Sequence, residues 1–206
     1  MHFCTNCGAG RILRDPIPER GIAICTQCGT ENEIPRVPLL VITGGSGSGK
    51  STVAQGLLRK RNPYVVVDAD YLCHDRESFD SWDSFWNFAT IVSLTLARNL
   101  RPIVLVGWVN PSQIEKAATS AYFSAVHFLV LSCDPSTQTE RLEGRSLSGV
   151  VKAPTPESIS VALHGTRFIT EEAHSRPNAT VLDTTSLTRD QTVPTVDRWI
   201  LERLDG

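Results

Sequence analysis

The chain lacks a long apolar run and lacks an excess of positive charge. Its 206 residues carry 20 lysines and arginines against 22 aspartates and glutamates, a formal net charge of −2. No stretch approaches the roughly 20 apolar residues that span a membrane, and the first residues lack the apolar segment of a secretory signal. We therefore expect a soluble cytoplasmic protein without a membrane partner. The balanced charge argues against a surface built mainly for nucleic acid.

Two motifs of large nucleotide-binding classes are also absent. The chain contains no Asn-Lys-x-Asp run, which argues against a GTPase of the Ras type. The apolar run Ile103–Val106 ends in Gly107-Trp108 and not in an acid. Motor ATPases and many transporters instead end a strand with an aspartate that holds the Mg²⁺ shell.

A glycine-rich run is present, and it fills every fixed position of the phosphate-binding pattern G-x-x-x-x-G-K-[ST]. Its residues are Gly44, Gly45, Ser46, Gly47, Ser48, Gly49, Lys50, Ser51 and Thr52. Glycines let the backbone turn so that N–H groups point at phosphate oxygens, and the following helix adds its positive end. Lys50 can reach the outer phosphates, and the Ser51 hydroxyl can ligate Mg²⁺. The run predicts binding of ATP, or another nucleoside triphosphate, with Mg²⁺.

Strand and helix patterns alternate after residue 38. Apolar strand patterns lie at 39–42, 64–67, 103–106, 125–131 and 180–182. Helical patterns follow the glycine-rich run and occur at about 81–100, 112–120, 135–142, 157–174 and up to 204. This alternation predicts an α/β fold with a parallel sheet flanked by helices, in which ligands bind beyond the carboxyl ends of the strands.

Residues 1–37 form a second predicted domain, separate from the main domain at 38–206. Cys4 and Cys7 form one Cys-x-x-Cys pair, Cys25 and Cys28 form another, and 17 residues separate them. Each pair precedes a glycine, which favours a four-thiolate Zn²⁺ site of the zinc-ribbon type. Two redox dithiols are the alternative. We expect the ribbon to act as a stabilising cap or as a docking site for a protein partner, and a nucleic-acid contact is the less favoured alternative.

Two carboxylates follow the second predicted strand. Asp68 and Asp70 lie two residues apart, so on an extended strand they would point the same way. We predict that Asp70 is the base that accepts a proton from an acceptor hydroxyl and that Asp68 holds the Mg²⁺ side. The reverse order stays open, as does a simpler role in which one of them caps the next helix.

The glycine-rich run, Asp68-Ala69-Asp70 and Glu140–Arg145 together resemble the small P-loop kinases. These include the shikimate, gluconate, adenylylsulfate and chloramphenicol kinases, the 5′-hydroxyl polynucleotide kinases and nucleoside-kinase-like bacterial ATPases. The resemblance covers residues 38–206. It implies a lid at about 141–168 with Arg141 and Arg145 near the phosphates, and Asp183 and Thr184 on the adenine side.

The acceptor side is the least specified part of the site. Tyr71, Arg76 and Trp108 follow strand ends and are the predicted acceptor contacts. The helical spacing of Trp82, Phe85 and Trp86 predicts core positions for most of them. The leading hypothesis is an ATP-dependent phosphotransferase acting on a hydroxyl of a small molecule, with a nucleoside-like metabolite considered first. The alternatives are a 5′-hydroxyl polynucleotide kinase or nucleic-acid-associated ATPase that uses the ribbon, and a non-catalytic nucleotide sensor.

Overall fold

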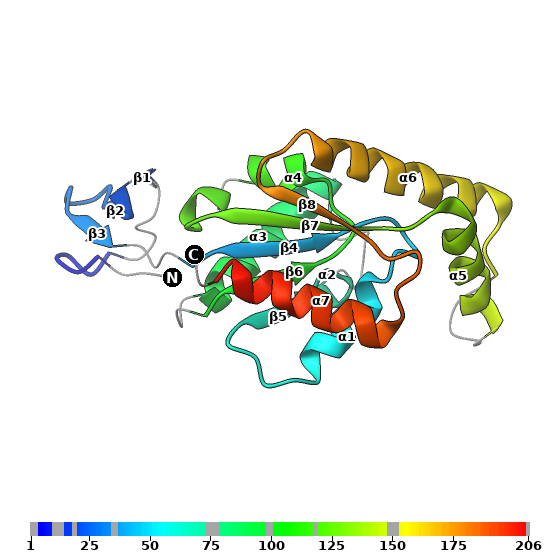
Figure 1. Cartoon of the computed structure of the whole chain (residues 1–206). Coiled ribbons are helices and arrows are strands. Elements are labelled where there is room, and N and C mark those ends of the chain that lie inside the picture. Colours follow the sequence, from blue (N-terminus) through cyan, green and yellow to red (C-terminus); the bar gives the residue numbers. More distant parts are fainter. Residues whose placement is uncertain are drawn as a thin grey trace.

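The computed structural model describes residues 4–9, 15–17, 20–33, 37–72, 79–97, 101–117, 119–147 and 153–204. These residues form two sheets, a three-stranded antiparallel sheet and a five-stranded parallel sheet (Figure 1). The small sheet lies at the amino-terminal end of the large sheet's strands. The glycine-rich run lies at the opposite end (Figure 1).

The small sheet consists of β1 (Asp15–Ile17), β2 (Ile22–Ile24) and β3 (Glu31–Glu33), paired in that order. It contacts the main domain through Ala23 of β2, which is fully buried and packs with Tyr122 and Leu94. Tyr122 belongs to the short 3-10 helix η3 (Ser120–Tyr122). The two modules therefore touch through a small apolar contact.

The large sheet has the strand order β5-β6-β4-β7-β8. Its strands are β4 (Leu39–Thr43), β5 (Val65–Asp68), β6 (Ile103–Val106), β7 (Val126–Ser132) and β8 (Ala179–Asp183). All neighbours pair in parallel. The strand order reverses at β4, and in open α/β sheets ligands bind beyond the carboxyl ends of the strands at such a point.

Helices cover both faces of this sheet (Figure 1). One face packs against α1 (Lys50–Leu58) and α7 (Arg189–Glu202), and the other against α3 (Trp82–Ala97), α4 (Pro111–Lys116) and α6 (Pro156–His174). Along β4, Leu39 and Val41 belong to the α3 side and Leu40 and Ile42 to the α1 side. Strands that are covered on both faces are nearly continuously apolar, and β4 and β6 are accordingly buried at every residue.

Two further helices follow strand ends: α2 (Ala69–Leu72) begins directly after β5, and α5 (Pro135–Leu147) begins shortly after β7. The α/β fold predicted from the sequence is thus confirmed. The predicted helix up to about residue 120 is shorter than expected. It ends at Lys116, where the Ala117 N–H bonds back to the Ile114 carbonyl, and η3 follows.

Candidate active site

The glycine-rich run forms a loop between β4 and α1 at the point where the strand order reverses. Gly44, Gly47 and Gly49 have φ angles of 143°, 89° and 106°, which side chains other than glycine rarely adopt. Gly45 is needed for another reason. A Cβ atom there would lie 1.8 Å from Thr166 Oγ1 of α6. Backbone conformation therefore explains three of these four glycines, and close packing against α6 explains Gly45.

Two residues of α5 hold the carbonyl side of this loop. Gln138 is 1% exposed, and its Nε2 lies 2.6 Å from the Ser46 carbonyl oxygen and 2.8 Å from Thr166 Oγ1. One turn later, Arg141 donates to the carbonyl and hydroxyl oxygens of Thr184. The Thr184 hydroxyl in turn lies 3.3 Å from the Ser48 carbonyl oxygen. The Ser46 and Ser48 carbonyl oxygens are thus both engaged on this side of the loop.

The first turn of α1 carries the other predicted phosphate contacts. Lys50 Nζ donates to the Gly45 carbonyl oxygen at 2.9 Å, which folds the lysine back over the loop. Ser51 and Thr52 follow it and are half-buried. The N–H groups of a first helical turn have no acceptor within the helix, and together with the helix dipole they favour an anion. A triphosphate fits this donor set.

Asp68 and Asp70 are arranged differently from the extended geometry predicted. The strand β5 ends at Asp68 and α2 begins at the next residue. The Asp68 carboxylate accepts a hydrogen bond of 3.1 Å from the Asp70 N–H. The expectation that the two side chains lie on one side of a strand is therefore wrong, because the chain turns into a helix between them. Asp68 holds the helix start and Asp70 is exposed in the first turn.

The electrostatic environment of Asp68 connects it to the phosphate loop. Burial raises the pKa of the Asp68 carboxyl, and the charge of Asp70 adds to this rise. The hydrogen bond from the Asp70 N–H and the positive charge of Lys50 oppose it, but the net direction is upward. Asp68 is thus near enough to Lys50 to feel its charge. Its carboxylate and the Ser51 hydroxyl are oxygen ligands of the kind Mg²⁺ prefers.

A cavity of about 450 Å³ lies beside the loop. Its lining residues are Gly47, Ser48, Gly49, Thr52, Arg141, Gly144, Thr184, Leu187, Arg189 and Thr192. The predicted adenine-side residue Thr184 is in this lining, whereas the Asp183 carboxylate is exposed and accepts hydrogen bonds from Thr185. Arg141 lies against Thr184 on the cavity wall. Leu187 and Arg189 were not predicted, since only the fold brings the start of α7 to the loop.

Two of the predicted acceptor contacts, Tyr71 and Trp108, are not in the lining of this cavity. Trp108 follows β6 and is 42% exposed, and Tyr71 in α2 is 78% exposed. Arg76 lies outside the described residues, as does the side chain of Arg145. The predicted lid at 141–168 stays a prediction. Within it, Ala162 and Thr166 of α6 are buried.

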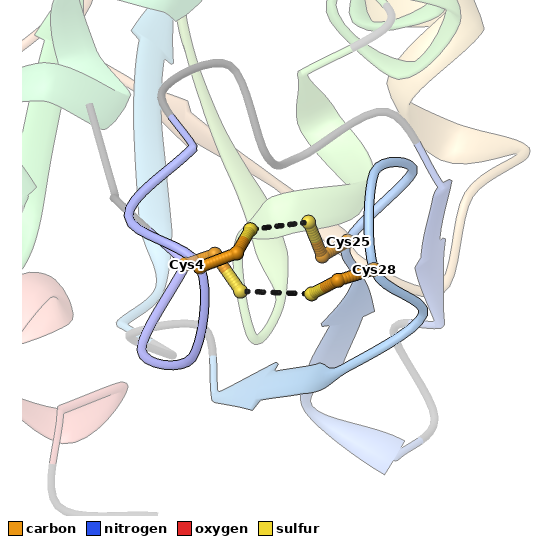
Figure 2. Close-up of side chains that lie close together, drawn as sticks. Cys4, Cys25 and Cys28 are labelled. Atoms are coloured by element: carbon orange, nitrogen blue, oxygen red, sulfur yellow. Dashed lines mark hydrogen bonds between the residues drawn. The ribbon is translucent and has the colours of Figure 1, made fainter.

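The four cysteines of the small module lie together as the sequence predicts. Their sulfur atoms are all within 4.8 Å of one another, with Cys4 and Cys28 sulfurs 3.5 Å apart (Figure 2). Four sulfurs bound tetrahedrally to Zn²⁺ at 2.3 Å would be about 3.8 Å apart. Gly8 and Gly29 have φ angles of 71° and 74°, and each donates its N–H to the carbonyl oxygen of the first cysteine of its pair. The geometry fits a Zn²⁺ site.

The charges around these sulfurs also suit a cation. Hydrogen bonding with Thr30 lowers the pKa of the Cys28 thiol to about 6. For Cys7, the Ala9 N–H lowers the pKa, but the neighbouring sulfurs and burial raise it to about 12. Crowded thiolates therefore resist full ionisation, and a bound cation would relieve this repulsion.

Comparison with solved structures identifies the fold. A gluconokinase from Sinorhizobium meliloti 1021 is 21% identical with a TM-score of 0.58, over 84% of this chain and 96% of that one. The APS kinase of Mycobacterium tuberculosis, in a complex with AMPPNP and APS, is 20% identical with a TM-score of 0.52, over 81% and 99%. The Deinococcus radiodurans tunicamycin resistance protein is 16% identical with a TM-score of 0.55, over 80% and 96%. The resemblance to P-loop kinases is confirmed at the level of fold.

Among the described helices, none has both the length and the apolar character to cross a bilayer. No curated protein sequence matches the chain. A family model does: the one described as AAA domain matches residues 39–160. These residues hold β4, the phosphate loop, Asp68 and the start of α6, and they make up more than half of the chain. The chain therefore belongs to this AAA domain family, with the fold of a P-loop kinase.

Proposed function

We propose that the chain is a kinase that transfers the γ-phosphoryl group of ATP, or of another nucleoside triphosphate, to a hydroxyl of a small molecule. One observation carries this proposal: Lys50 of a complete phosphate loop lies near enough to Asp68, the first of two neighbouring carboxylates, for its positive charge to act on the pKa of that carboxyl. A module that only bound a nucleotide could use Asp68 for Mg²⁺ but would not need the second, exposed carboxylate of Asp70. The fold of the similar kinases supports the same interpretation.

In the proposed reaction Asp70 accepts the proton of the acceptor hydroxyl. The acceptor oxygen forms a bond to the γ-phosphorus, and the bond from this phosphorus to the ADP oxygen breaks. The loop N–H groups and Lys50 stabilise the negative charge that the phosphoryl oxygens carry during transfer. Asp70 suits this role because it is exposed, whereas Asp68 is half-buried and already engaged at the start of α2.

Ser51 and Asp68 would hold Mg²⁺. The ion would neutralise phosphate charge when bound. Arg141 contributes indirectly, since its guanidinium is committed to Thr184, which touches the loop carbonyl of Ser48. We therefore assign Arg141 to the nucleotide cavity and to the support of the loop, and not to a direct contact with the transferred phosphoryl group.

We propose residues 1–37 as a zinc-ribbon domain and 38–206 as the kinase domain. Val37 is 8% exposed and packs in the main core, which supports a boundary at this residue. The ribbon lies at the amino-terminal end of β4 and the phosphate loop at its carboxyl end (Figure 1). Five strand residues separate them by about 17 Å. This separation favours a stabilising cap over a clamp that presents a nucleic-acid end to the loop.

The test is a screen of hydroxyl-bearing metabolites for ADP release, with the phosphorylated product identified by mass spectrometry. Lys50→Ala should abolish release, because the loop loses its cation. Lys60→Ala is the matched control, since this exposed lysine pairs with Asp197 away from the loop. Asp70→Asn should bind ATP with unchanged affinity but transfer at least about a hundredfold more slowly, within the range for general-base catalysis.

A nucleotide sensor and a kinase give different results in this test. A sensor would bind ATP and release no ADP with any acceptor, and Asp70→Asn would then change nothing. An ATPase associated with nucleic acid would release phosphate in the presence of oligonucleotides and label no small molecule. Either result would contradict the proposal.

A further inference from the structure

Two exposed tryptophans form a joined aromatic surface beside the carboxylate pair. The rings of Trp82, at the start of α3, and Trp108, after β6, are 6.2 Å apart between centroids and nearly perpendicular, at 79°. Each is 42% exposed. Their neighbours Phe85 and Trp86 are 3% and 2% exposed, so the helix buries one aromatic pair and leaves Trp82 at the surface.

Packing fixes the position of Trp108. A Cβ atom on Gly165 of α6 would lie 3.2 Å from the Trp108 ring, so the indole lies directly against the glycine backbone. Glycine at this position lets the large ring lie close to α6. A ring supported in this way offers its remaining surface with little loss of side-chain entropy on binding.

The aromatic surface and the carboxylates leave the sheet at the same edge. Asp68 at the end of β5 pairs with Val106 at the end of β6. Asp70 lies two residues after Asp68, and Trp108 lies two residues after Val106. A Cβ on Gly107 would lie 2.9 Å from the Ala69 Cβ, which confirms that the two connections touch. An acceptor that reaches Asp70 would therefore lie beside Trp108.

Among the described residues of α2 and the segment 79–97, the charges disfavour an anionic acceptor. The described ionisable side chains on α2 and in the segment 79–97 are Asp70, Tyr71, Asp80 and Asp83, and Asp68 lies directly before α2. A sugar acid or a sulfate ester would meet these carboxylates without a described cation on the same elements. An uncharged aromatic ring of an acceptor would avoid this repulsion and could stack on the surface formed by Trp82 and Trp108.

We propose that Trp82 and Trp108 form the binding wall for the acceptor and that the acceptor is a neutral nucleoside. This inference rests on the proposed kinase function. The base would stack on the tryptophan surface, and a sugar hydroxyl would give its proton to Asp70. The hydroxyl oxygen then bonds to the γ-phosphorus as the bond to ADP breaks, which yields a nucleoside monophosphate, ADP and one proton.

The experiment measures phosphoryl transfer from ATP to uridine, cytidine, adenosine and guanosine, with gluconate as the anionic open-chain comparison. The variants are Trp108→Leu and Trp108→Phe. Phe88→Leu is the matched control, because Phe88 is a similarly exposed aromatic residue (39%) of α3 that packs on Phe79. Thermal melting of each variant checks that the fold is retained.

We expect transfer to at least one nucleoside and not to gluconate. Trp108→Leu should raise the KM for that nucleoside about tenfold or more, in keeping with base–aromatic stacking. The nucleoside KM of Trp108→Phe should lie between the values of Trp108→Leu and wild type. The KM for ATP should stay within twofold in both variants. Phe88→Leu should change neither KM.

Two results would overturn the inference and leave the kinase proposal standing. The first is transfer to gluconate with all four nucleosides inert. The second is a nucleoside KM that is the same in wild type and in a folded Trp108→Leu variant. Failure to bind ATP would instead overturn the kinase proposal itself, and the inference with it.

Discussion

Gly45→Ala should separate the phosphate loop from α6. Gly45 does not have a positive φ angle, so its backbone conformation alone would accept alanine. Space does not, because the new Cβ would lie 1.8 Å from Thr166 Oγ1 and 3.0 Å from the Ala162 carbonyl oxygen. Ordinary contacts between heavy atoms are about 3.5 Å. The loop and α6 would therefore have to move apart by roughly 1.5 Å.

The size of the effect follows from this overlap. Inserting a methyl group into a packed site costs about 1–3 kcal/mol. For a domain of this length each kcal/mol lowers the Tm by about 2–4 °C, so we expect a fall of about 2–12 °C. Gly144→Ala in α5 is the matched control for thermal melting only, because Gly144 lines the nucleotide cavity. A Cβ there meets no atom within 4 Å, and replacing a helical glycine should stabilise the fold by about 0.5–1 kcal/mol.

The assay combines thermal melting with titration of MgATP. Gly45→Ala should weaken MgATP binding as well as lower the Tm, since the displaced loop carries the N–H donors. Adding Thr166→Ala removes the closest atom but leaves the Thr166 Cβ position 3.0 Å from the new methyl group, so the double variant should recover only part of both losses. If Gly45→Ala melted and bound MgATP like wild type, the described packing of α6 on the loop would be wrong.

Three further predictions concern the loop, the carboxylates and the ribbon. Gln138→Leu should weaken MgATP binding and cost about 1–3 kcal/mol in unfolding free energy, because the Ser46 carbonyl and Thr166 hydroxyl lose their buried partner; equal MgATP titrations would contradict this. Asp68→Asn should raise the Tm at pH 7 but not at pH 3. The fold raises the pKa of Asp68, so wild type loses stability as pH rises through this value and the asparagine variant does not; a Tm difference independent of pH would refute it. Removing Zn²⁺ with a chelator should expose Cys4 and Cys25 to thiol reagents and leave MgATP affinity within twofold, and a large loss of affinity would show that the ribbon supports the loop.

Local patterns predicted the parts of the molecule that depend on local physics. The strand before the loop, the glycines with positive φ and the paired cysteines each follow from spacing within a few residues. The parallel sheet followed from alternation of strand and helix patterns. These features need no knowledge of distant contacts.

The parts that sequence reasoning missed depend on contacts between distant segments. Gln138 donates a hydrogen bond to the Ser46 carbonyl oxygen, although 92 positions separate the two residues in the sequence. Nothing in the sequence around a glutamine or a serine indicates such a contact. The prediction that the Asp68 and Asp70 side chains point the same way was wrong, because β5 ends at Asp68 and α2 begins at the next residue. Helical periodicity placed Phe85 and Trp86 in the core, but it could not show that Trp82, on the same stripe, stays exposed beside Trp108.

The most direct test of the central claim follows the label from γ-³²P-ATP in the presence of a pool of hydroxyl-bearing metabolites. The account predicts that the label appears in an organic phosphate with wild type and not with Lys50→Ala, and at a strongly reduced rate with Asp70→Asn. Label that appears only as inorganic phosphate, at a rate that is the same with and without the metabolites, would contradict it.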